Sequence, residues 1–152
     1  SGIDTQTATS YCAATYLNGM YYLAIADDET TITTDNVSVW KSSDMITWTQ
    51  IGVGVLMTGT VASLAIGHTG STASDTGVWV AVNDGGNVRL LHYEDIAGGT
   101  TYAWRVVGTL LTGATTGPST ASGVSIATDG VSIIGVSAIT STDAQTNFWY
   151  NQ

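Results

Sequence analysis

The chain has 152 residues, 43% of them hydrophobic, and carries 3 Lys and Arg against 12 Asp and Glu, which gives a formal net charge of −9 at pH 7. This length fits a single domain over residues 1–152, and the apolar content excludes intrinsic disorder, which combines low hydrophobicity with high charge. So few cations argue against nucleic acid and membrane partners, since both bind clustered Lys and Arg, and no apolar run reaches the roughly 20 residues of a membrane-spanning helix.

The composition predicts an all-β fold. Ser and Thr make up about a quarter of the chain, and there are 18 Gly but 1 Pro. The branched side chain of Thr favours strands, whereas Gly favours turns and bulges. Residues typical of helix surfaces are scarce, and no segment has a convincing helical periodicity.

The first predicted unit covers residues 11–52, with strands near 11–17, 20–26, 37–41 and 47–52. Asn18-Gly19 separates its first two strands. This pair supplies the positive φ angles of a type I′ turn, so it predicts a tight hairpin.

A second unit over residues 61–108 follows the same plan, with strands near 61–67, 78–82, 88–93 and 102–107. Trp48 and Gly52 at the end of the first unit recur as Trp104 and Gly108 at the end of the second. Repeats of about 40–55 residues with four short strands are typical of propeller blades, and we expect both Trp rings in blade cores.

The third unit, residues 123–152, has only three predicted strands, near 123–127, 131–139 and 147–150, and residues 3–9 are predicted to supply its fourth. Two and a half to three blades cannot close a ring, because single-chain propellers use about four or more. The sequence therefore leaves three arrangements open: two chains that complete a ring of six, a β-sandwich, or attachment to a larger assembly. Of these, the homo-oligomer is the favoured hypothesis.

Ser42-Ser43-Asp44, followed by Trp48 and Gly52, resembles the blade hairpin of Asp-box propellers such as sialidases and of five-bladed glycoside hydrolases. The turn is one residue shorter than the usual Asp box and lacks its Gly. In such a turn the Asp and Ser accept backbone N–H groups while the Trp packs beneath. The resemblance implies a propeller blade and a structural role for Asp44.

The sequence contains no recognisable set of catalytic residues, so we expect that the protein is not an enzyme and has no cofactor. Glycoside hydrolysis needs two facing carboxylates, but the only glutamates, Glu29 and Glu94, are predicted in solvated loops. Arg89 and Arg105 are too few for the arginine cluster of a sialidase. Cys12 is the only cysteine, which excludes an intrachain disulfide, and it is predicted to be a buried, inert thiol.

The sequence evidence for a metal site is equally weak. His68 and His92 lie far apart in the sequence and are predicted to be ordinary strand residues, so we expect no zinc site. The acidic loop Asp27-Asp28-Glu29 lacks EF-hand spacing, and calcium binding there stays an open alternative.

The aromatic residues are the remaining clue, with 5 Trp and 7 Tyr against 1 Phe. Tyr and Trp combine an apolar face with a polar edge and are favoured at protein interfaces and sugar-binding surfaces. Tyr21 and Tyr22 in the first hairpin, and Trp149 and Tyr150 near the end of the chain, are therefore the predicted interface or ligand surface.

The favoured functional hypothesis is a non-enzymatic module that acts through protein–protein contacts or host-surface adhesion. Its composition resembles that of phage virion proteins such as capsid decoration and tail or fibre proteins, which implies a virion location and other virion proteins as partners. Otherwise the protein is expected to be extracellular or soluble. Alternatives are a lectin-like propeller that binds glycans between its blades and, less favoured, a fragment of a glycoside hydrolase.

Overall fold

The computed structural model describes residues 9–28, 35–57, 61–84, 87–98, 101–111, 123–131, 134–140 and 145–151. Within these ranges every regular element is a β-strand, apart from one short 3₁₀ turn, η1 (Asp75–Gly77). The predicted all-β class is therefore confirmed. No described helix is long and apolar enough to cross a membrane.

Sheet A contains the first predicted unit. Its antiparallel strands are, in order, β1 (Thr9–Leu17), β2 (Met20–Asp28), β3 (Asp35–Ser42) and β4 (Thr49–Gln50), with β5 (Val55–Leu56) also paired to β3. Asn18 and Gly19 have φ angles of 47° and 86°, which confirms the tight turn between β1 and β2. The predicted strand over 47–52 is shorter than expected, since only Thr49 and Gln50 pair with β3.

Sheets B and C repeat the antiparallel order. Sheet B consists of β6 (Val61–His68), β7 (Val78–Asp84), β8 (Val88–Asp95) and β9 (Tyr102–Leu111), and sheet C of β10 (Val124–Thr128), β11 (Ile134–Thr140) and β12 (Gln145–Asn151). The number and order of strands in both units match the predictions. The fourth strand that residues 3–9 are predicted to supply lies almost wholly outside the described residues, and Thr9 instead begins β1.

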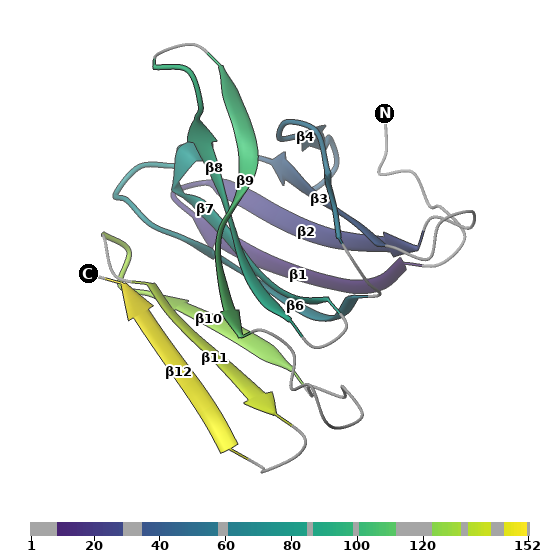
Figure 1. Ribbon diagram of the computed structural model, residues 1–152. Helices are drawn as coiled ribbons and strands as arrows, with labels where there is room; N and C mark the ends of the chain where they lie inside the picture. The colour runs from purple at the N-terminus through teal and green to yellow at the C-terminus, as the bar shows by residue number, and fades with distance from the viewer. Residues whose placement is uncertain are drawn as a thin grey trace.

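The three sheets pack on one another through their apolar faces. Alternation along β7 directs Val80 and Val82 into the core shared with sheet A, while Ala81 packs in a second core with Val136 of sheet C. Sheet B therefore packs on sheet A through one face and on sheet C through the other. The first strands of the three sheets are neighbours, because β6 contacts both β1 and β10 (Figure 1). None of the sheets closes on itself in the described part of the chain.

The two repeated tryptophans differ in burial. Trp104 is 9% exposed and its Nε1 donates a hydrogen bond of 2.7 Å to the Ile51 carbonyl of the first unit. Trp48 is only half-buried, and its Nε1 lies 3.3 Å from the Met45 carbonyl. The prediction of a core tryptophan is confirmed for Trp104, which joins sheets A and B, and is wrong for Trp48, which lies outside the core cluster because it follows the turn at Asp44 and precedes β4.

Candidate functional site

The Asp-box-like turn after β3 is a structural element. Asp44 Oδ1 accepts the backbone N–H groups of Ile46 and Thr47, each at 2.8 Å, and the Ser42 hydroxyl accepts that of Met45 at 2.8 Å. The backbone N–H groups of Thr47 and Ile46, together with the Ser42 hydroxyl, which donates to Asp44 Oδ1 at 2.9 Å, stabilise the carboxylate and lower the pKa of Asp44 to about 2. The predicted structural role of Asp44 is confirmed.

The predicted aromatic surface is only partly at the surface. Tyr22 has no exposed area, because alternation along β2 turns its side chain toward sheet B, so its prediction as a surface residue is corrected. Tyr21 points the other way, is half-buried, and has its ring 4.8 Å from that of Tyr16. Trp149 and Tyr150 lie on β12, and their side chains are outside the described part of the structure, so their surface role stays a prediction.

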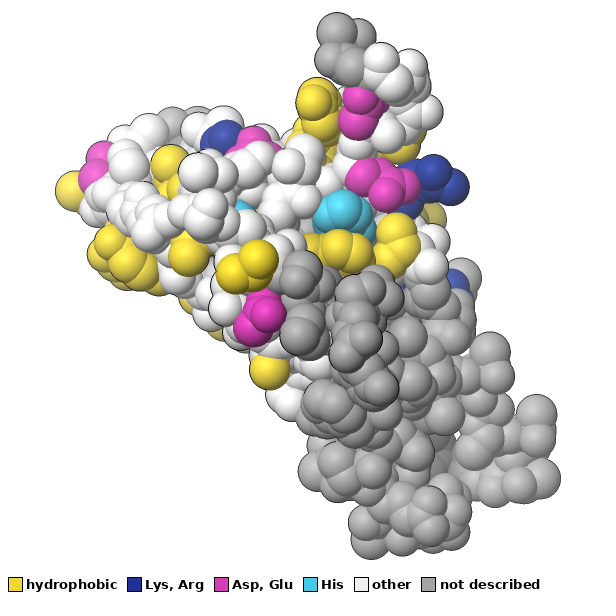
Figure 2. Space-filling view, turned by 90° about the vertical axis from the view of Figure 1, so that its left-hand side faces the viewer, with side chains coloured by type: hydrophobic (Ala, Val, Ile, Leu, Met, Phe, Trp, Pro, Cys, Tyr) yellow, Lys and Arg dark blue, Asp and Glu magenta, His cyan; other side chains and the backbone are white. Residues whose placement is uncertain are grey.

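Two further residues differ from their predictions. Cys12 is exposed, because it lies on the face of β1 directed away from sheet B. Glu94 is not in a solvated loop: β8 extends to Asp95, and Glu94 lies 3.1 Å from Arg105 Nη1 and 3.5 Å from His92 Nδ1. Histidine, acidic and basic side chains gather on the face shown in Figure 2.

The described residues contain no group of three His, Cys, Asp or Glu side chains placed to hold a metal ion. Glu29 of the acidic loop falls outside those residues. The backbones of Asp27 and Asp28 end β2, where they pair with Asn36 and Asp35. As predicted, His68 and His92 are strand residues, on β6 and β8.

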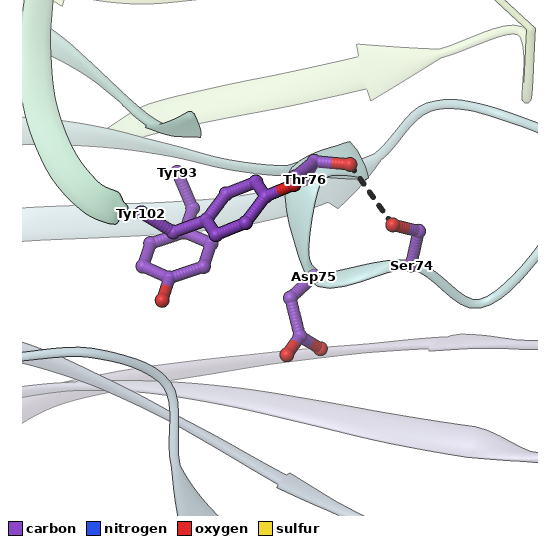
Figure 3. Close-up of a pocket in the computed structure, with 5 residues that line it drawn as sticks. All are labelled: Ser74, Asp75, Thr76, Tyr93 and Tyr102. Carbon is purple, nitrogen blue, oxygen red and sulfur yellow. Dashed lines mark hydrogen bonds between the residues drawn. The ribbon is translucent and has the colours of Figure 1, made fainter. Parts of the chain in front are cut away.

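A pocket of about 300 Å³ opens beside sheet B and is the candidate ligand site. It is lined by Ser74, Asp75 and Thr76 from the segment before β7 and by Tyr93 and Tyr102 from β8 and β9. Figure 3 shows the two tyrosine rings on one side of the pocket and the three shorter side chains on the other. This volume is at the lower end of the range for ligand pockets.

The aromatic side of the pocket is a continuous stack. The Tyr93 and Tyr102 rings have centroids 6.0 Å apart and planes inclined by 24°, and the Tyr93 ring lies 5.3 Å from that of Trp104. Gly52 approaches this stack so closely that an added Cβ would lie 2.8 Å from Tyr93 Cε2. Because Trp104 is anchored in the core, the stack holds Tyr93 in place at the pocket.

Two histidines hold the polar side of the pocket. His68 Nε2 lies 2.7 Å from the Ser74 carbonyl, and His92 Nε2 lies 2.7 Å from the Thr76 carbonyl. The His92 ring also stacks on Trp79, with centroids 3.7 Å apart. The two histidines, on β6 and β8, thus fix the backbone of residues 74–76.

The charge at the pocket is balanced. Asp75 Oδ2 lies 2.6 Å from Nζ of Lys41, which β3 of sheet A presents. The Tyr22 hydroxyl is buried near this pair, and burial together with the Asp75 carboxylate raises the pKa of Tyr22 to about 12. No local sequence pattern predicted this site, since its lining residues come from β8, β9 and the segment before β7 and meet only when sheet B folds.

A second candidate surface is the face of sheet A that is directed away from sheet B, called here the outer face. Strand alternation and register place seven apolar side chains on it: Cys12, Ala14, Tyr16, Tyr21, Leu23, Ile25 and Trp40. Apart from the buried Ile25, these side chains are half-buried or exposed. An exposed apolar sheet face of this kind is typical of a docking surface.

Comparison with known proteins identifies no relative: no family model, no curated protein and no solved structure matches the chain. The candidate sites therefore stand on the geometry described above.

Proposed function

We propose that the chain is a non-enzymatic structural or binding module whose three sheets are propeller-like blades, and that a second copy continues their stacking. In the simplest such assembly two chains close a ring of six blades. The observation that carries this proposal is that sheet B packs on a neighbouring sheet through each of its faces, whereas the outer face of sheet A is apolar and no other described sheet covers it.

The order of the sheets supports a blade arrangement. The first strands β1, β6 and β10 are neighbours, as the innermost strands of successive blades are in a propeller. Trp104, in the last strand of the second unit, faces the first unit and bonds to Ile51. Each unit would then use one face toward the preceding unit and the other toward the following one.

The repeat also indicates what fits the outer face. Trp48 is the sequence counterpart of Trp104 and lies two residues before Gln50, which pairs with Trp40 of the outer face. By strand alternation, the outer face of sheet A therefore corresponds to the face of sheet B that packs on sheet A. Sheet C of a second copy is therefore the matching occupant of the outer face. This contact is head-to-tail, and it forms a closed ring if the rotation that relates the two copies returns to the first one.

The proposal is tested with a charge on the outer face. Leu23→Glu places a carboxylate in the apolar patch and is expected to shift the protein from dimer to monomer in light scattering, since burying an unpaired charge is costly. The matched control is Ile46→Glu, which makes the same kind of change at a residue that is 82% exposed in the turn after β3. A Leu23→Glu protein that remains dimeric, or an equal loss of dimer in both variants, contradicts the proposed interface.

We also propose that the module is a component of a phage virion, as a capsid decoration or tail protein. Its scarcity of Lys and Arg and richness in Ser, Thr and Gly support this assignment. On a repetitive lattice, many copies together compensate for weak single contacts. Sedimentation of virions from cells that produce this chain tests the location, and a chain found only in the unassembled fraction contradicts it.

A non-enzymatic role is supported by the state of the acidic residues described above. Glu94 is bound by Arg105 and His92, and the pKa of Asp44 is lowered, whereas a glycosidase acid needs a raised pKa. Aryl glycosides are therefore expected to remain intact. Hydrolysis that disappears in Glu94→Gln would instead support the hydrolase alternative.

A further inference from the structure

The pocket beside sheet B has the chemistry of a small-ligand site, and this function goes beyond the proposed self-association. We infer that the pocket lined by Tyr93, Tyr102, Ser74, Asp75 and Thr76 binds a neutral saccharide unit. The pocket lies within one chain, so this inference does not depend on the second copy.

The aromatic side provides a surface for the apolar face of a sugar ring. Tyr102 is 44% exposed, although its ring is fixed against Tyr93, and Tyr93 is fixed against Trp104. A pyranose exposes C–H groups on one face, and such groups pack well on an aromatic ring with a hydrated edge. The two phenol groups add donors and acceptors at the rim of the same surface.

The polar side provides groups that bind hydroxyls. The Ser74 and Thr76 hydroxyls lie 2.9 Å apart and each can donate or accept, while the Asp75 carboxylate accepts (Figure 3). The histidine contacts to the Ser74 and Thr76 carbonyls hold these groups in position before a ligand arrives. Preorganisation of this kind lowers the ordering cost of binding.

The charge of the pocket selects a neutral ligand. Among the described residues that line it, Asp75 is the only charged one, and it is already neutralised by Lys41 at 2.6 Å. An anionic sugar would meet the Asp75 carboxylate without a free cation among the lining residues, and a cationic ligand would compete with Lys41. A neutral hydroxylated ring can use the second carboxylate oxygen without disturbing the ion pair.

The test is saturation-transfer NMR with the full chain and methyl glycosides of glucose, galactose, mannose and N-acetylglucosamine at millimolar concentration. At least one of these probes is expected to receive magnetisation from the protein through its ring C–H protons. Methyl glucuronide, which adds a negative charge to the same ring, is expected to bind less well. No signal from any neutral probe, or stronger binding of the glucuronide, overturns the inference.

Variants locate the binding in this pocket. Tyr102→Ala is expected to weaken binding about 5–10-fold, whereas Tyr102→Phe, which keeps the ring, retains most of it. The matched control is Tyr11→Ala, because Tyr11 on β1 is 43% exposed and lies outside the pocket. Unchanged binding in Tyr102→Ala, or an equal loss in Tyr11→Ala, overturns the assignment.

A second variant keeps the inference falsifiable where Tyr102→Ala disturbs the fold. Asp75→Asn preserves the size of the side chain and removes its charge, so it is expected to weaken binding of the neutral probe about 5–10-fold. Unaltered affinity in this variant overturns the role of Asp75. Both pocket variants are expected to leave the mass in light scattering unchanged, so failure of this inference is distinguishable from failure of the proposed self-association.

Discussion

Replacing Trp104 by alanine tests the packing of sheet A on sheet B. Trp104 is 9% exposed and packs among core residues of both sheets, and its Nε1 donates a hydrogen bond to the Ile51 carbonyl. Burial of roughly 200 Å² at about 25 cal/mol per Å² contributes about 5 kcal/mol as an upper bound. Measured truncations of buried Phe and Trp cost about 3–5 kcal/mol, and the unpaired Ile51 carbonyl adds to this. We expect Trp104→Ala to lose about 4–5 kcal/mol of unfolding free energy.

Urea unfolding, followed at one fixed protein concentration, measures this loss. The matched control is Trp48→Ala, since Trp48 is only half-buried and its Nε1 contact to Met45 is longer, at 3.3 Å. We expect this control to lose about 1–2 kcal/mol, in proportion to its smaller burial. A loss below about 1 kcal/mol for Trp104→Ala, or equal losses for both tryptophans, would show that Trp104 does not join the two sheets.

Two further predictions concern titrating side chains. The Tyr22 hydroxyl is buried without a hydrogen-bond partner in the described part of the chain, so Tyr22→Phe is expected to leave stability at pH 7 equal or higher by up to about 1–2 kcal/mol. Because the pKa of Tyr22 is raised from 10.0 to about 12, the wild type loses stability as pH rises through this interval, and the variant lacks this loss. A clear destabilisation of Tyr22→Phe at pH 7 would contradict a hydroxyl without a hydrogen-bond partner. The pKa of Asp44 is lowered from 3.8 to about 2, so its contribution is present above 3.8 and is lost as pH falls toward 2. The stability difference between wild type and Asp44→Asn should therefore shrink over that interval in urea titrations, and a constant difference would contradict the turn's dependence on the carboxylate.

Local sequence signals predicted most of the strand plan. The Asn18-Gly19 turn forms as expected because the backbone preference of this pair acts within four residues. The Asp44 turn likewise follows from side chains that bond to their nearest backbone neighbours. Its hydrogen bonds also explain why β4 begins late, since the N–H group of Thr47 bonds to Asp44 in the turn instead of pairing with β3.

Features that depend on which face a strand presents were harder to predict. Tyr22 and Tyr21 are adjacent in sequence, yet alternation buries one in the core and turns the other to the outer face. Cys12 lies in an apolar segment but is exposed for the same reason. The ion pair beside the pocket joins Lys41 of β3 to Asp75 of η1, and no local pattern encodes a contact between residues so far apart.

The proposed stacking of the sheets into a second copy is tested by the mass of the purified protein in solution. Light scattering across a dilution series should give twice the chain mass of 15.7 kDa, and this value should hold at low concentration. A mass that stays at 15.7 kDa throughout the series would contradict the claim, because the outer face of sheet A would then have no second copy to cover it.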